Sequence, residues 1–163
     1  MSSNLTHEQA LNLLASFSLA LHSDVLPGGD VRIETPFKYP DGTSIEVFIE
    51  ADTPLPAVRL SDQGQTTAWL LNLDLKPWLN NRRRVLMEDA LHTYGVELSG
   101  GKLVLALRDA TALPEGVIRM SQACIRVADL SFTLHSSPQS TFFDRLEEDF
   151  EDATLPDPPR SES

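Results

Sequence analysis

Cysteine is almost absent from this chain, which has 163 residues and a single thiol, Cys124. One cysteine excludes an internal disulfide framework and any zinc site built from several cysteines, and it favours a reducing compartment. Apolar runs of about 20 residues, the length needed to cross a bilayer, are also missing, and the N-terminus, MSSNLT, has no basic leader. These absences predict a cytoplasmic protein.

Basic residues are scarce, with 13 Lys and Arg against 24 Asp and Glu, which gives a net charge of −11. Residues 144–163 carry 8 acids and 2 bases, so this stretch holds −6 of the total and the rest of the chain −5. The negative electrostatic field of such a chain repels nucleic acid and anionic membranes. The charge therefore favours a protein partner with a basic surface and argues against direct nucleic-acid binding.

The remaining composition, with 41% hydrophobic and 23% charged residues, is that of an ordinary globular protein. The length fits one domain. We expect a single domain over residues 1–137. Residues 138–163 are rich in acids and proline, a composition that favours disorder, and we expect a mobile acidic tail there.

Hydrophobic spacing predicts an α+β fold, in which a small antiparallel sheet of two hairpins and a short strand packs with about four helices. Thr6 and Gln9 have the spacing of a capping box before the first helix, and Asn80 or Asn81 can cap the third. The predicted helices cover about residues 7–22, 66–75, 81–94 and 113–134, and the predicted strands 31–39, 45–49, 58–60, 96–98 and 103–107. The apolar positions predict one continuous core that includes Phe37, Val47, Leu60, Leu70, Leu86, Leu105 and Val127.

Four sequence blocks occur in a recognisable order: TPFKYPDG at residues 35–42, IEVF at 45–48, RLSDQGQT at 59–66 and YGVE at 94–97. Together with the hairpin that follows, this pattern resembles an uncharacterised bacterial domain-of-unknown-function family over about residues 31–107. The resemblance implies that the gene lies in prophages or other mobile elements, where small proteins often regulate, inhibit or accompany phage and anti-phage machinery. It implies no active residues. The helix after Pro114 is expected to lie outside the shared block.

Three features contain polar or reactive groups that are candidates for a functional role. Asp62 and Gly64 stand at a strand-to-helix junction, where they could form an anion site, although a helix cap needs the same pair. Arg82, Arg83 and Arg84 form the basic cluster of the chain, which could grip phosphate or an acidic surface. Cys124 lies at a core position, where a thiol acts as a small hydrophobe rather than as a nucleophile.

The acids of the predicted sheet region allow a metal-dependent nuclease or related phosphate enzyme as an alternative, with Asp41, Glu46 or Asp62 as ligands. Glu34 and Glu50 belong to the same set. The lysine that usually supports such a site is missing, because no Asp/Glu-x-Lys triplet follows the second strand. The histidines have no ligand spacing, and no cofactor motif is present. Whether the protein is an enzyme stays open, with the balance towards a non-catalytic role.

The acidic tail contains an apolar stripe that would be amphipathic as a helix. Its predicted partner-binding residues are Phe142, Phe143, Leu146 and Phe150, with Glu147 and Glu148 on the acidic face. We therefore expect a non-catalytic protein-binding or regulatory module of a phage or mobile element that acts on a defence, toxin or regulatory protein. A DNA-mimicking inhibitor of a nucleic-acid-binding enzyme is a further alternative. A homodimer through an exposed sheet edge is also compatible with the pattern.

Overall fold

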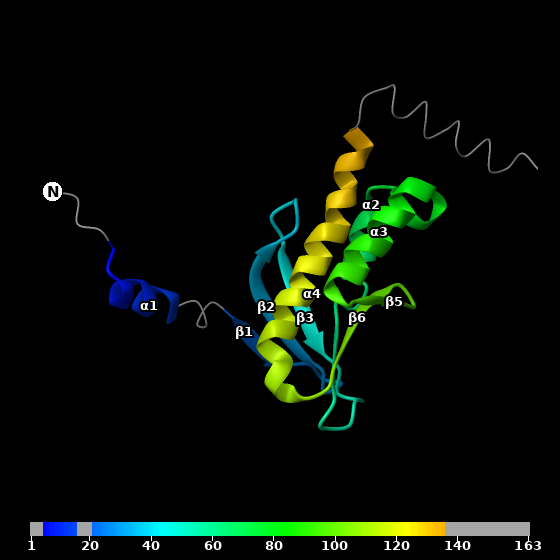
Figure 1. Ribbon diagram of the computed structural model, residues 1–163. Coiled ribbons are helices and arrows are strands. Elements are labelled where there is room, and N and C mark those ends of the chain that lie inside the picture. The colour runs from blue at the N-terminus through cyan, green and yellow to red at the C-terminus, as the bar shows by residue number, and fades with distance from the viewer. Residues whose placement is uncertain (1–4, 16–20, 136–163) are drawn as a thin grey trace, which may run out of the picture.

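A six-stranded antiparallel sheet with helices packed on one side forms the body of the protein in the computed structural model, which describes residues 5–15 and 21–135 (Figure 1). The strand order is β1-β2-β3-β4-β6-β5. The α+β prediction is confirmed. The strands are β1 (His22–Val25), β2 (Val31–Lys38), β3 (Ser44–Ile49), β4 (Val58–Ser61), β5 (Glu97–Ser99) and β6 (Lys102–Leu107). The α-helices are α1 (His7–Ala15), α2 (Gln65–Asn72), α3 (Asn81–Tyr94) and α4 (Leu113–Ala128). The short 3-10 helices of the described residues are η2 (Pro77–Leu79), η3 (Ala110–Ala112) and η4 (Asp129–His135).

The N-terminal region differs from the sequence prediction, which extended the first helix to residue 22. The capping box forms, with the Thr6 N–H donating to Gln9 Oε1 at 3.0 Å and the Gln9 N–H donating to Thr6 Oγ1 at 3.2 Å. However, α1 ends at Ala15, and His22 begins an additional edge strand, β1. The reason is the Pro-Gly-Gly turn that follows, since it lets β1 fold back and pair with β2 in an antiparallel hairpin.

The two predicted hairpins are confirmed as β2–β3 and β5–β6. In the first, Gly42 has φ +87°, a conformation that a side chain disfavours, and its N–H donates to the Tyr39 carbonyl at 2.9 Å. The Asp41 carboxylate accepts from the Thr43 N–H at 2.9 Å and fixes the turn. Hydrogen bonds within the turn are the main cause that holds the pKa of Asp41 below its ordinary value.

Helix α4 lies across the sheet and supplies the centre of the core (Figure 1). Of the predicted core residues, Val47, Leu60, Leu70, Leu105 and Val127 are fully buried, and Phe37 packs against the cluster while partly exposed. Leu86 was predicted wrongly, because 43% of it is exposed and Met87, Ala90 and Leu91 face the core instead. Each step along a helix rotates a side chain by about 100°, so an error of one position turns a core residue outwards.

None of the helices in the described part of the chain combines the length and apolar composition needed to cross a membrane.

Candidate functional site

A groove runs between α3 and the edge strand β5, and the local sequence explains why these two elements lie side by side. Asn80 caps α3, with its side chain accepting from the Arg83 N–H at 3.0 Å, and Gly95 ends the helix in the left-handed conformation at φ +66°. The Val96 N–H donates to the Leu91 carbonyl at 2.9 Å, which completes the cap and turns the chain into β5. The predicted cap and stop of this helix are thus confirmed.

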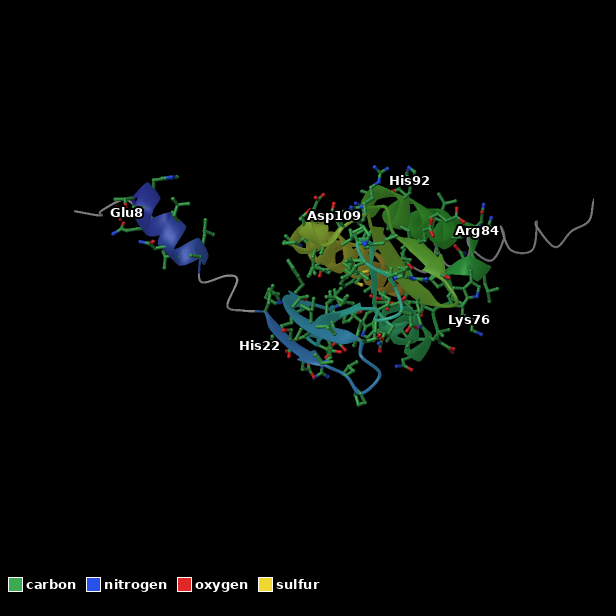
Figure 2. All side chains as sticks on the ribbon, turned by 90° about the horizontal axis from the view of Figure 1, so that it is seen from below. Glu8, His22, Lys76, Arg84, His92 and Asp109 are labelled. Atoms are coloured by element: carbon green, nitrogen blue, oxygen red, sulfur yellow. The ribbon has the colours of Figure 1, made fainter. Side chains whose placement is uncertain are left out.

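The α3–β5 groove has an apolar floor and a charged rim, with a volume of about 500 Å³. Met87, Leu91 and Val96 are buried beneath it, whereas Trp78 from η2 and Leu98 from β5 expose about two fifths of their surface at its sides. The charged lining residues are Arg84, Glu88, His92 and Glu97, and Figure 2 shows Arg84 and His92 on the outer side of the body. Such a combination suits a ligand with an apolar anchor and polar flanks.

Strand β5 is the terminal strand of the sheet and pairs on one side with β6, where Leu98 lies opposite Leu103. Its outer side presents backbone N–H and C=O groups, which can pair with an added strand. All three β5 residues are exposed. The groove therefore offers a main-chain template beside an apolar floor.

The arginine cluster does not form one surface. Arg84 lines the groove and donates to Asn81 Oδ1 at 2.8 Å, whereas Arg83 is half-buried and its Nε donates to Thr133 Oγ1 at 2.8 Å. Arg82 is exposed. Successive helix positions point about 100° apart, so the three guanidinium groups separate. Arg84 is the member that joins the candidate site.

Asp62 and Gly64 form a structural turn whose donors are already used. Asp62 is fully buried, and its carboxylate accepts from the backbone N–H groups of Gly64 at 2.8 Å, Leu103 at 2.9 Å and Thr66 at 3.0 Å. Gly64 has φ +79° and precedes α2. Since the side chain of Asp62 takes the place that an external anion would occupy, this turn acts as the cap of α2.

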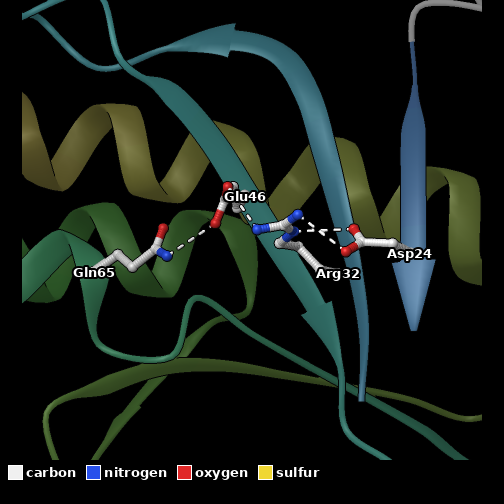
Figure 3. A network of polar contacts seen from close by, with 4 residues as sticks. All are labelled: Asp24, Arg32, Glu46 and Gln65. Atoms are coloured by element: carbon white, nitrogen blue, oxygen red, sulfur yellow. Dashed lines mark hydrogen bonds and ion pairs between the residues drawn. The ribbon is translucent and has the colours of Figure 1, made fainter. Parts of the chain in front are cut away.

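The acids considered as metal ligands in the nuclease alternative lie in separate local contacts and do not gather at one place. On the face of the sheet opposite α4, Arg32 pairs with Asp24 at 3.0 Å and lies 3.9 Å from Glu46, which also accepts from Gln65 Nε2 at 3.1 Å (Figure 3). The hydrogen bond to Asp24, together with the charge of its carboxylate, raises the pKa of Arg32 above its ordinary value.

Further along this face, Glu50 pairs with Arg59 at 3.1 Å. Within residues 5–15 and 21–135, no three His, Cys, Asp or Glu side chains are arranged to hold a metal ion. Arg32 and Arg59 thus lie among the acids of this face.

Cys124 lies wholly inside the core, where burial raises the pKa of its thiol to about 12. Nearby, the Tyr39 hydroxyl shares a 2.8 Å hydrogen bond with Thr66 Oγ1, and burial also raises the pKa of Tyr39. A neutral, enclosed thiol is a poor nucleophile. The cysteine therefore serves packing.

The predicted tail residues Phe142, Phe143, Leu146, Glu147, Glu148 and Phe150 lie outside the described residues. The groove itself was missed by sequence reasoning. The signal that could have suggested it was Trp78 and Leu98, two large apolar residues at positions that do not fit the core pattern.

Comparison with known protein families matches residues 35–127 to the domain of unknown function DUF1828, more than half of the chain. The chain belongs to the DUF1828 family. The DUF1828 match begins within β2 and ends within α4, so it contains η2, α3 and β5 and thus the whole α3–β5 groove. It also corrects the expected limit of the shared block, since most of the helix after Pro114 is included. No curated protein and no solved structure matches the chain.

Proposed function

We propose that this DUF1828 protein is a non-catalytic protein-binding module that captures an extended segment of its partner in the α3–β5 groove. The observation that carries the proposal is the position of a terminal strand directly beside an apolar-floored groove. A segment added to β5 would gain main-chain hydrogen bonds, and its alternate side chains would point towards the groove.

The lining predicts the chemistry of the bound segment. Met87 and Leu91 at the floor, with Trp78 and Leu98 at the sides, would receive one large apolar side chain. Main-chain pairing would extend over about three residues, the length of β5. Affinity would then depend on the anchor, as buried aromatic and aliphatic groups dominate most interfaces.

Charge would act mainly on the association rate. The chain carries a net charge of −11, and this long-range field favours a partner with a basic surface. We extend the proposal to an action in the cytoplasm on a defence, toxin or regulatory protein. The support for this extension is the neighbourhood of prophages and mobile elements that the sequence resemblance implies, together with the single cysteine.

A random-peptide library selected on the immobilised full chain tests the proposal. Selected peptides should contain a large apolar residue, and Leu98→Asp should weaken their binding at least tenfold. Leu86→Asp is the matched control, because Leu86 is 43% and Leu98 42% exposed, and Leu86 does not line the groove.

Methylation of successive backbone nitrogens in a selected peptide distinguishes strand addition from simple pocket binding. Because alternate N–H groups of an added strand face β5, the loss of affinity should recur at every second position. A uniform effect of methylation would rule out strand addition. Equal losses for Leu98→Asp and Leu86→Asp would exclude this groove as the binding site.

A further inference from the structure

A second groove, the β2–α4 groove, lies at the other end of the sheet, with a volume of about 310 Å³. Its walls are entirely apolar side chains from β2, from the start of α4 and from the residue before β1. Ile33 and Val117 form the buried part, while Leu21 and Ile118 are 40% and 43% exposed. Covering an open apolar surface of this kind with another apolar surface removes both from water, which lowers the free energy.

Helix α1 carries a matching apolar surface. Leu11 and Leu14 stand one turn apart on the helix and are 53% and 67% exposed, and no residue of α1 is buried. The helix has nine residues, fewer than the roughly 12 to 15 below which an isolated helix is only marginally stable in water. Packing of its apolar side against another surface would supply the missing stability.

The chain connects the helix to the groove. Leu21 lines the groove and directly precedes β1, and α1 ends six residues earlier at Ala15. Six extended residues span at most about 20 Å. Figures 1 and 2 nevertheless show α1, marked by Glu8 in Figure 2, standing apart from the sheet and from α4 of its own chain. Its apolar side is thus presented outwards, within short reach of the β1 edge.

We propose that a second copy of this chain inserts its α1 helix into the β2–α4 groove, in a two-fold dimer where each chain gives one helix and receives one. When the two chains exchange their α1 helices, both grooves and both helices are covered, and the two-fold symmetry leaves no further copy of either surface free to bind another chain. Because the C-terminal end of each helix stays within about 20 Å of Leu21, such a dimer places the β1 edges of the two copies near each other. All four β1 residues are exposed, as such an edge contact requires.

This inference is independent of the α3–β5 groove and of the proposed function. The family match begins at residue 35, so α1 and β1 both lie outside the matched region. Loss of dimerisation should leave peptide capture at the α3–β5 groove unchanged.

Light scattering of the full chain at increasing concentration measures the assembly. The mass should rise to about twice the 18.0 kDa of one chain. Leu14→Asp on the helix and Ile118→Asp at the groove should each weaken the dimer at least tenfold. Leu55→Asp, at an exposed leucine outside both surfaces, should leave it unchanged.

Disulfide trapping identifies the occupant of the groove. The native thiol, Cys124, is buried, so Leu14→Cys in a tagged chain and Ile118→Cys in an untagged chain should form a mixed disulfide-linked dimer. Leu14→Cys mixed with Leu55→Cys is the control. A wild-type chain that stays monomeric overturns the exchange, and so does a chain carrying both Leu14→Cys and Ile118→Cys that closes the disulfide within itself. Absence of any disulfide between positions 14 and 118 overturns it as well.

Discussion

The carboxylate of Asp62, at the end of β4, accepts a hydrogen bond at 2.9 Å from the backbone N–H of Leu103 in β6, 41 residues further along the chain. The return bond runs from the Asp62 N–H to the Leu103 carbonyl at 3.1 Å. The same carboxylate caps α2 through Gly64 and Thr66. One buried side chain therefore joins two strands and a helix.

Replacement of this acid should be among the most damaging single changes. Asp62→Ala would leave three backbone donors without their acceptor in a buried site, and we expect a loss of about 3 to 5 kcal/mol of unfolding free energy. Asp62→Asn should cost less, since its amide oxygen still accepts, although its NH₂ group would face one of the donors. Urea denaturation measures both. Asp52→Ala, at an exposed loop position, is the control, and equal stability of all three variants would contradict the capping role.

Leu70→Ala should lower the free energy of unfolding by about 2 to 5 kcal/mol, because the side chain is fully buried and its removal leaves a cavity. Leu71→Ala removes the same atoms from the next residue of α2, which is 43% exposed, and should cost less than about 1 kcal/mol. Thermal unfolding of the two variants side by side provides the comparison. A melting curve for Leu70→Ala that matches the wild type would refute its core position.

Gly95→Ala should destabilise the junction of α3 and β5. The residue has φ +66°, and an added Cβ would meet the guanidinium of Arg119, whose Nε and Nη2 donate to the Tyr94 carbonyl at 3.0 and 2.8 Å. The left-handed conformation alone costs about 1 to 2 kcal/mol for an alanine. Gly28→Ala is the matched control, since its added Cβ meets no atom and its φ is not in the left-handed region. Similar unfolding midpoints for the two variants would show that the junction tolerates a side chain.

Stability should fall in alkaline solution because of the buried thiol. The pKa of Cys124 is raised from 9.0 to about 12 by burial, so folding favours the neutral form. The contribution is fully present below pH 9.0 and is lost as the pH rises towards 12. In Cys124→Ala, the decline should begin only near pH 10.0, where the tyrosine in the unfolded chain ionises while buried Tyr39 resists. Denaturation at pH 8 to 11 tests this, and identical pH profiles would contradict it.

Much of the fold was predictable because its signals are local. The Asn80 cap, the Gly95 stop and the Tyr39–Thr43 turn depend on residues within a few positions of each other. Strand β1 was missed because its four residues lack alternation and are all exposed. Its pairing with β2 and the Asp24–Arg32 contact stabilise it, and neither is visible in the segment alone.

The candidate sites were harder to predict than the elements that form them. The α3–β5 groove combines residues from η2, α3 and β5, and the β2–α4 groove combines Leu21 with side chains from β2 and α4. A sequence pattern records which residues are apolar. It does not record which apolar residues are left uncovered when elements distant in the chain pack together.

The sequence by itself determined the acidic charge, the α+β pattern, the positions of most caps and turns, and the family block from residue 35 onwards. Only the tertiary structure decided the strand order, the outward position of Leu86, the three-way bonding of Asp62 and the location of the two grooves. The physical reason is the range of the interactions. Caps, turns and periodicity arise between neighbours in the chain, whereas sheet order and exposed surface arise from contacts between segments up to tens of residues apart.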